Sequence, residues 1–317
     1  MSCRIVTIGD LTVDLVMPVT LPIESGQSQR IPWHTIEPGA TGNFLIAGAR
    51  LGAEMVALGA VGNDLYGHYV RDVLAAEGID VEGVVIAPGT PTTVVAVLFE
   101  PDAGKFSYVW HGGEGDPLPV SDTARRLIEQ GDALFMQGFT LSEESLRPLV
   151  EHAFSSGKPI WCDVGPSVIH VSDTDRARIR QHVYALMTTE DEVPLIAEGL
   201  TGPAAYAFLL ESGTQLLVIK RGAQGCMVMT TTERFEVPAF PVKVRDLVGA
   251  GDSFNAAFMV GALRGLSLRE AAILANATGG AKVQKLGTGR AMPTRAEVTA
   301  VLESGGYRIT FQGDSNP

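Results

Sequence analysis

Short apolar runs alternate with longer amphipathic stretches along most of this chain. Short apolar runs are typical of buried strands, whereas apolar positions three or four residues apart predict helices. We predict strands at residues 4–8, 12–17, 55–61, 133–136, 159–162, 183–187 and 216–219. We predict helices at residues 44–51, 64–77, 122–130, 142–154, 173–181, 190–198, 203–211, 252–263, 268–282 and 295–303. This alternation predicts an α/β fold with a mostly parallel central sheet covered by helices on both faces.

Residues 92–110 break the alternation with a segment that contains strand patterns only. Thr92–Phe99 is apolar and β-branched, Lys105–Trp110 alternates, and Pro101–Gly104 between them has turn composition, so the segment predicts a hairpin. Short strands at residues 225–230 and 234–237 predict an antiparallel edge of the main sheet.

Several polar side chains lie at or just past the ends of predicted strands. They are Asp10, Asp14, Gln137, Asp163 and Lys220. Ligands of parallel α/β sheets bind at the carboxyl ends of the strands. Each residue alone is also typical of a cap or a turn, but their convergence on one edge indicates a binding site.

Three small residues in a row, Gly249, Ala250 and Gly251, precede Asp252 and an apolar helical pattern. A turn of this kind presents unpaired backbone N–H groups at the positive end of a helix dipole, which suits a phosphate group. A carboxylate on that first turn is a candidate general base for a hydroxyl nucleophile. The alternative is a tight turn followed by a helix cap.

The composition of the chain limits the classes of protein to which it can belong. The chain has 317 residues, 45% of them hydrophobic, and no linker, which predicts a single domain over residues 1–317. A net charge of −12 argues against nucleic acid or an anionic membrane as partner. Three scattered cysteines, with no signal-peptide pattern and no long apolar stretch, predict a cytoplasmic protein.

Two blocks far apart in the sequence resemble one known family. The segment Asp246-Leu247-Val248-Gly249-Ala250-Gly251-Asp252 is similar to the Asp-Thr-x-Gly-Ala-Gly-Asp motif of the ribokinase-like, PfkB-type carbohydrate kinases. Near the N-terminus, residues 9–14 and 38–43 resemble the family's first strand and its Gly-Gly-x-x-x-Asn sugar loop. Leu247 replaces the usual Thr, and Pro38 replaces the first Gly. The resemblance covers essentially the whole chain and implies a three-layer α/β/α fold with a small β-sheet lid.

The resemblance also implies roles for individual residues in ATP-dependent phosphorylation of a sugar. Asp252 would be the catalytic base, and the backbone of Gly249, Ala250 and Gly251 would hold the transferred phosphate. The sugar hydroxyls would be bound by Asp14, Gly39, Asn43 and Asp252. The lid would comprise residues 13–36 and 90–112, and closing it would exclude water.

The nucleotide and its ions are assigned in the same way. ATP would contact Lys220, Gly222, Gly225, Gly249, Gly251 and Asn276. Glu192, in a Thr-Glu-Asp-Glu segment that replaces the family's Asn-x-x-Glu, would order Mg²⁺ indirectly. Asp246 and Val248 would take part in a monovalent-cation site, with K⁺ as its ion. The sequence contains no Gly-x-x-x-x-Gly-Lys-Ser/Thr loop, which argues against a P-loop NTPase.

Three hypotheses about function remain open on the sequence alone. The first is an ATP-dependent sugar kinase, and the second is a nucleoside kinase of the same fold. The second predicts that Trp33, Trp110 or Phe139 stacks beside the sugar site. The third is a catalytically silent protein that binds a sugar or a nucleotide. For all three, the resemblance implies a homodimer formed through the lid sheets.

Overall fold

A large, mostly parallel sheet forms the centre of the molecule. The computed structural model describes residues 2–112 and 115–310. Within these residues the sheet has nine strands in the order β13-β12-β11-β10-β9-β8-β1-β4-β5. The strands are β1 (Arg4–Ile8), β4 (Glu54–Gly62), β5 (Asp80–Ala87), β8 (Ala133–Gln137), β9 (Ile160–Asp163), β10 (Ala185–Thr189), β11 (Leu216–Lys220), β12 (Cys226–Met229) and β13 (Arg234–Val237). The pairs β11–β12 and β12–β13 are antiparallel, so the antiparallel edge predicted from the sequence is confirmed.

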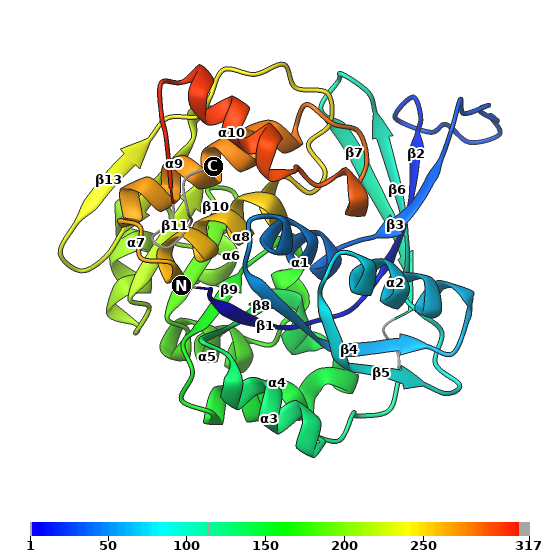
Figure 1. Cartoon of the computed structure of the whole chain (residues 1–317), viewed down its shortest axis with the longest axis horizontal. Helices are drawn as coiled ribbons and strands as arrows, with labels where there is room; N and C mark the ends of the chain where they lie inside the picture. The colour runs from blue at the N-terminus through cyan, green and yellow to red at the C-terminus, as the bar shows by residue number, and fades with distance from the viewer. Residues whose placement is uncertain (1, 113–114, 311–317) are drawn as a thin grey trace.

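Helices cover both faces of this sheet, as Figure 1 shows. One face carries α1 (Thr41–Arg50), α2 (Leu65–Ala76), α8 (Ala250–Leu263), α9 (Leu268–Lys282) and α10 (Arg295–Ser304). The other carries α3 (Asp122–Gln130), α4 (Arg147–Ser155), α5 (Asp173–His182), α6 (Val193–Ile196) and α7 (Gly202–Glu211). Each layer buries its own apolar cluster against the sheet. The predicted three-layer α/β/α fold is confirmed.

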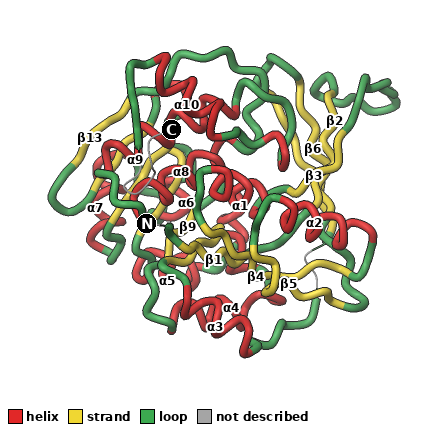
Figure 2. The backbone as a smooth tube through the Cα atoms, in the orientation of Figure 1, coloured by secondary structure: helices red, strands yellow, loops and turns green. Residues whose placement is uncertain are grey.

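A second, smaller sheet projects from the body at the right of Figure 1. Its strands stand in the order β3-β2-β6-β7, namely β3 (Thr35–Pro38), β2 (Val13–Pro18), β6 (Val94–Glu100) and β7 (Lys105–His111). β6 and β7 form the predicted antiparallel hairpin. A long loop connects β2 to β3 and extends beyond the sheet in Figure 2.

Several elements differ from the sequence prediction, and β3 (Thr35–Pro38) was not predicted at all. The helix predicted at 142–154 begins only at Arg147, because Pro148 lacks an N–H and is tolerated only in a first turn. The helix predicted at 190–198 begins only at Val193 for the same reason, with Pro194 in its first turn, and it ends at Ile196, before Glu198 with its positive φ. The strand β5 was not predicted, since Asp80, Glu82 and Gly83 interrupt its apolar pattern.

Among residues 2–112 and 115–310, no helix is both long and apolar enough to cross a bilayer. The three cysteines, Cys3, Cys162 and Cys226, are buried and unpaired.

Candidate active site

The first turn of α8 lies at the carboxyl edge of the large sheet. Gly249 caps the helix with φ at 78°, a left-handed conformation that favours glycine. A Cβ added there would also lie 2.7 Å from Cε of Met292. Ala250 N–H donates to the Leu247 carbonyl at 3.2 Å, while the N–H groups of Gly251 and Asp252 belong to a helical turn that lacks intrahelical acceptors. These amides lie at the positive end of the helix dipole, an arrangement suited to an anion.

Asp252 is held in place by two amide side chains. Its Oδ2 accepts a hydrogen bond from Asn43 Nδ2 at 2.9 Å, and its Oδ1 accepts a longer one from Gln137 Nε2 at 3.4 Å. Asn43 is fixed in turn, because its Oδ1 accepts from the Gly289 N–H at 2.8 Å. Burial raises the pKa of Asp252 to about 6, and the nearby carboxylate of Asp163 adds to this rise. At neutral pH the carboxylate is therefore mostly ionised and able to accept a proton.

Asp14 and Gly39 meet at the start of the small sheet. A Cβ added at Gly39 would lie 1.8 Å from Oδ1 of Asp14, so the buried carboxylate needs glycine at this position. Burial raises the pKa of Asp14 to about 7, with contributions from the carboxylates of Asp252 and Glu37. The charges of Asp252 and Glu37 therefore act on Asp14, which makes this an acidic region of the site.

Lys220, at the end of β11, forms an ion pair on the other side of the helix turn. Its ammonium donates to Asp163 Oδ1 at 2.7 Å, and Asp163 ends the neighbouring strand β9. Nζ also lies 3.6 Å from the position that a Cβ would take at Gly251, so this glycine leaves space between lysine and helix. Glu192 is held by the Thr189 N–H at 2.9 Å. Burial and the charge of Asp163 raise the pKa of Glu192.

The remaining predicted nucleotide residues form a separate group near β12 and β13. Gly222 and Gly225 both have positive φ, and a Cβ at Gly225 would lie 2.0 Å from the Val237 carbonyl oxygen. The Asn276 Nδ2 donates to the carbonyls of Val237 and Pro238 at 3.1 and 3.2 Å. The amide nitrogen of Asn276 thus links α9 to the end of β13, and its contact with adenine stays a prediction.

Asp246 and Val248 lie on the inner side of the turn. Asp246 Oδ1 accepts from the Val248 N–H at 2.9 Å, and Oδ2 accepts from the Gly287 N–H at 2.8 Å. The Val248 side chain packs in a cluster with Val97 and Phe99 of the small sheet. The turn is therefore in contact with both the body and the small sheet.

One face of the small sheet is turned toward these acids. Cross-strand pairing places Asp14, Val95 and Trp110 in one row across β2, β6 and β7, and Tyr108 follows Trp110 on the same face. Desolvation of the phenol end, followed by the charges of Asp252, Asp14 and Asp246, raises the pKa of Tyr108, although the residue as a whole is 48% exposed. Trp33, by contrast, packs on Phe99 with ring centroids 5.9 Å apart.

Comparison with known proteins identifies the family. Residues 3–295 match the sequence pattern described as "pfkB family carbohydrate kinase". The chain belongs to this family. The ribokinase of Bacillus subtilis (strain 168) is 30% identical over 304 residues, covering 94% of this chain and 99% of that protein. The 2-dehydro-3-deoxygluconokinase of Thermoproteus tenax is 28% identical over 280 residues, covering 84% of this chain and 85% of that protein.

A solved structure shares the fold of this carbohydrate kinase. It is a putative ribokinase II from E. coli in complex with ATP and Mg²⁺, with a TM-score of 0.82 and 22% identity, covering 95% of this chain and 99% of that chain. Together the relatives make this chain an ATP-dependent sugar kinase, a phosphotransferase with an alcohol group as acceptor.

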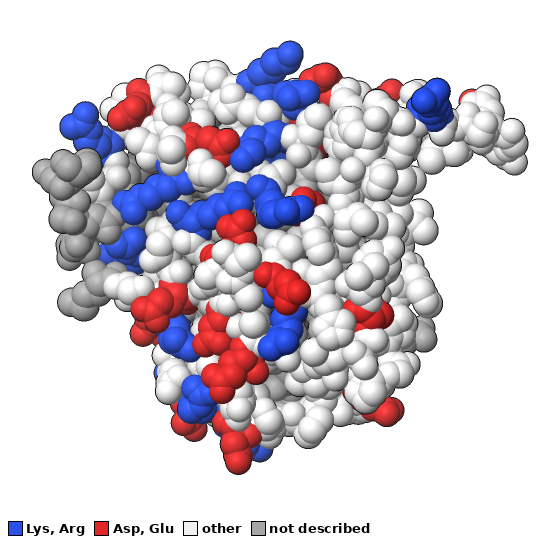
Figure 3. Space-filling view, turned by 45° about the vertical axis from the view of Figure 1, so that its right-hand side comes forward, with Lys and Arg blue, Asp and Glu red and all other residues white. Residues whose placement is uncertain are grey.

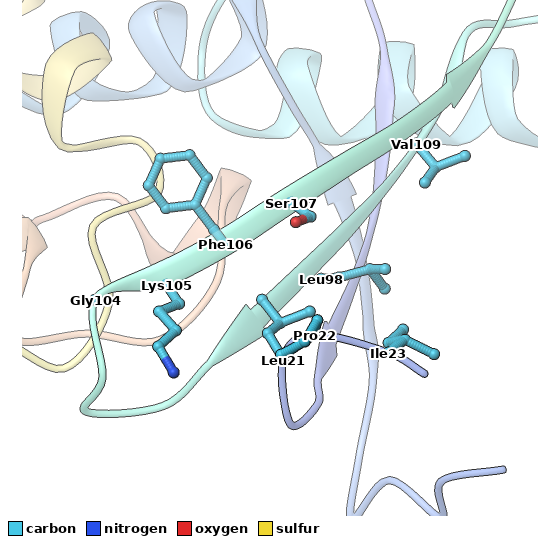
Figure 4. A pocket seen from close by; sticks show the side chains of 9 residues that line it. All are labelled: Leu21, Pro22, Ile23, Leu98, Gly104, Lys105, Phe106, Ser107 and Val109. Carbon is cyan, nitrogen blue, oxygen red and sulfur yellow. The ribbon is translucent and has the colours of Figure 1, made fainter. Parts of the chain in front are cut away.

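A hollow of about 670 Å³ lies on the small sheet of the kinase, and neither Asp14 nor Asp252 lines it. Leu98, Ser107 and Val109 line it, and these residues alternate with the ones that face Asp252. Figure 4 shows Leu98 and Val109 beside the loop residues Leu21–Ile23, with the ring of Phe106 on the other side of the strand. Figure 3 shows few charged side chains toward the right of its view, beyond a band of Lys and Arg.

Sequence reasoning did not assign roles to three of the side chains in this region. Gln137 was noted only as a strand-end residue. The effect of the acids' charges on Tyr108 depends on how the small sheet folds over the body. Lys282 is fully buried at the end of α9. One sequence signal was available, because Lys282 continues the buried helix face of Ala275 and Thr278 at helical spacing.

Proposed function

We propose that this kinase transfers the γ-phosphate of ATP to a hydroxyl group of a sugar, with Asp252 as general base. The observation that carries the proposal is the placement of an ionisable carboxylate, held by Asn43 and Gln137, on the first turn of α8. The sugar hydroxyl oxygen attacks the γ-phosphorus, its proton passes to Asp252, and ADP leaves. The backbone amides of Gly249, Ala250 and Gly251 stabilise negative charge on the transferred group.

The sugar binds between Asp14, Gly39, Asn43 and Asp252 in this proposal. Asp14 and Asn43 are both almost fully buried, at 4% and 2% exposure, so their polar atoms are positioned before the sugar arrives. A carboxylate and an amide together can accept and donate hydrogen bonds to neighbouring hydroxyls, as a polyol requires. Binding a sugar hydroxyl to Asp14 favours the ionised form of that carboxyl.

The nucleotide phosphates approach α8 from the side of Lys220. The space beside Gly251, which a Cβ would fill, lets a phosphate lie between the helix amides and this ammonium. Mg²⁺, when bound, neutralises phosphate charge, and its preference for oxygen ligands and retained water suits Glu192 and Asp163. Gly222, Gly225 and Asn276 then flank the nucleoside end of ATP.

The small sheet acts as a lid over this site, within residues 13–36 and 90–112. The packing of Val97 and Phe99 of the small sheet against Val248 of the body supports this role. So does the contact of the hairpin turn with the body, where the Asp102 N–H donates to the Arg245 carbonyl at 3.1 Å. A closed lid excludes water and limits hydrolysis of ATP.

The test is ADP release from Mg-ATP with a panel of pentoses, hexoses, keto-deoxy sugar acids and nucleosides. We expect turnover on one class of sugar. The Asp252→Asn variant should lower that turnover by on the order of 10²-fold or more while retaining sugar binding. Turnover that is insensitive to Asp252→Asn would exclude Asp252 as the base. Ligand binding without any turnover in the wild type would favour a silent binding protein.

A nucleoside kinase is the second candidate, and one observation favours it. Trp110 lies in the same row of the small sheet as Asp14 and its side chain is 63% exposed, so it offers an aromatic surface beside the sugar site. Bases stack on such surfaces. A Trp110→Ala variant with a raised KM for nucleosides, and an unchanged KM for free sugars, would support this candidate.

We also propose a homodimer in the cytoplasm. The outer face of the lid exposes Val109 at 62% and Ile23 at 49%, and apolar surface of this kind is typical of an interface. The buried, unpaired thiols suit a reducing compartment. Sedimentation of the wild type beside Val109→Lys tests the dimer, which the added charge should weaken.

A further inference from the structure

Lys282 is the last residue of α9, and its side chain is completely buried. Its ammonium lies 3.8 Å from Oδ2 of Asp246, whose side chain is only 1% exposed. It also donates to the Lys285 carbonyl at 3.4 Å. A buried cation costs several kcal/mol unless it is well paired, and 3.8 Å is longer than a hydrogen bond. An apolar residue would fill the same space without the free energy needed to remove a charge from water, so a stability role alone does not account for this lysine.

The position of the lysine supplies that explanation. A Cβ at Gly249 would lie 3.5 Å from Cε of Lys282, so the lysine stem runs directly behind the turn that begins α8. The positive charge of Lys282 acts across the turn on Asp252, because it lowers the pKa of that carboxyl. A charge in this place adds to the field of the helix dipole at the anion site.

The same pocket does not suit the monovalent cation that the sequence resemblance implied. A K⁺ bound through Asp246 would need the carboxylate and neighbouring carbonyl oxygens as ligands. The ammonium of Lys282 lies against the Asp246 carboxylate and a carbonyl of the following loop, while the Val248 N–H also points at that carboxylate. Two positive charges would have to share one buried acid.

We propose that Lys282 is a built-in cation that supports the anion site of this kinase, so that phosphoryl transfer does not require K⁺. The proposal rests on the proposed function of α8. Lys282 is a positioning residue in this scheme, since it acts through the Gly249–Gly251 turn and does not touch the phosphate. Asp246 holds Lys282 in place and joins it to the loop through the Gly287 N–H.

The first test uses the wild-type enzyme alone. Turnover is measured while KCl replaces tetramethylammonium chloride at constant ionic strength, with NaCl as a second series. We expect K⁺ to change kcat by less than about 2-fold. Saturable activation by K⁺ of about 5-fold or more, absent with Na⁺, would overturn the proposal whatever any variant does. Binding of Mg-ADP, measured by calorimetry in the two salts, gives a second readout that needs no sugar.

Two substitutions separate charge from packing. Lys282→Ala removes the charge and leaves space, whereas Lys282→Met removes the charge and fills the space. We expect both to lower kcat by about 10-fold or more with little change in the KM for sugar, because charge behind the turn acts on the transition state. K⁺ should restore part of the activity of the Ala variant and little of the Met variant.

The matched control is Lys285→Met, which removes a lysine three residues away that pairs with Glu297. It should retain kcat and show no response to K⁺. Equal loss in the Ala and Met variants with no rescue would mean that Lys282 only maintains structure, and would overturn the proposal. Should both variants fail to fold, the wild-type salt series still decides. Failure of the sugar panel would instead count against the proposed function, because the Mg-ADP measurement does not depend on it.

Discussion

Two buried lysines stand on opposite sides of the α8 turn, and their surroundings differ in a way that shows what each can do. Burial acts to lower the pKa of Lys220, but Asp163 at 2.7 Å and the nearby Glu192 outweigh it, so this pKa ends above its ordinary value. Burial lowers the pKa of Lys282 to about 8, because Asp246 at 3.8 Å offsets it only in part.

The difference follows from the number and the distance of the acids. Lys220 faces two carboxylates at the carboxyl ends of β9 and β10, where a phosphate and Mg²⁺ would arrive in the proposed function. Lys282 faces one carboxylate that already accepts two backbone N–H groups. Lys220 is therefore placed to contact a ligand directly. Lys282 is enclosed, so it can act on a ligand only through its electric field.

Removing Lys220 should have the largest effect. Lys220→Met leaves Asp163 and Glu192 close together without their cation and takes a positive charge from the phosphate path. We expect kcat/KM for ATP to fall by about 10²- to 10³-fold, with a raised KM for ATP. The control is Arg221→Met, whose partners Glu190 and Glu236 lie nearer the surface. An unchanged KM for ATP would remove the distinction between the two lysines.

The pH profile should report both lysines through Asp252. Its carboxyl must be ionised to accept a proton, and its pKa is raised to about 6, so kcat/KM should fall tenfold per pH unit below about pH 6. Removing a nearby cation disfavours the ionised form, so Lys220→Met and Lys282→Met should both move this acid limb to higher pH. The acid limb should shift further in Lys220→Met than in Lys282→Met, because the charge of Lys220 acts more strongly on Asp252. Limbs that stay in place would show that another group limits the rate.

Much of this site could be predicted from the sequence, because its parts lie in short local patterns. The Gly249–Asp252 turn is defined by consecutive small residues, and Asp163 and Lys220 follow apolar strands directly. The place of Lys282 could not be predicted in the same way. A lysine in the last turn of a helix usually faces solvent and complements the dipole. The helical spacing of Lys282 with Ala275 and Thr278 places it on the buried face of α9, but what covers it there depends on how α9 packs against α8.

The fold shows the same division between local and long-range information. The helix at residues 268–282 was predicted from local spacing, and the structure starts it with a local capping box at Ser267 and Glu270. Strand β5, by contrast, has polar residues that interrupt its apolar pattern, so the sequence did not predict it. Parallel pairing with β4 holds it in the sheet. The packing of Val97 and Phe99 against Val248 likewise needs the small sheet to fold over a distant segment.

Replacing Asp252 should stabilise the protein as it removes activity. Its pKa in the folded state, about 6, lies above the ordinary value of 3.8, so the ionised carboxylate destabilises the fold fully above about pH 6. The penalty shrinks as pH falls from 6 toward 4, where the carboxyl is protonated in the folded state and about half protonated in the unfolded state. Asp252→Asn should therefore raise the free energy of unfolding at pH 7.5 by roughly 1–3 kcal/mol and gain little at pH 4. Denaturant melts at the two pH values measure this, and a gain independent of pH would contradict the assignment of the penalty to charge.

The smallest effect should come from Leu247→Thr, which restores the residue usual in the family motif. Leu247 is 40% exposed, and its Cδ1 lies 3.7 Å from the position of a Cβ at Gly104 in the lid hairpin, so the change removes little buried surface. We expect kcat to change by less than about 3-fold, in line with the small effects of surface substitutions. The variant should also remain independent of K⁺, because Lys282 still occupies the pocket at Asp246. If Leu247→Thr alone made turnover depend on K⁺, the residue at 247 would control the cation requirement, and the contrast between the two lysines would lose its functional meaning.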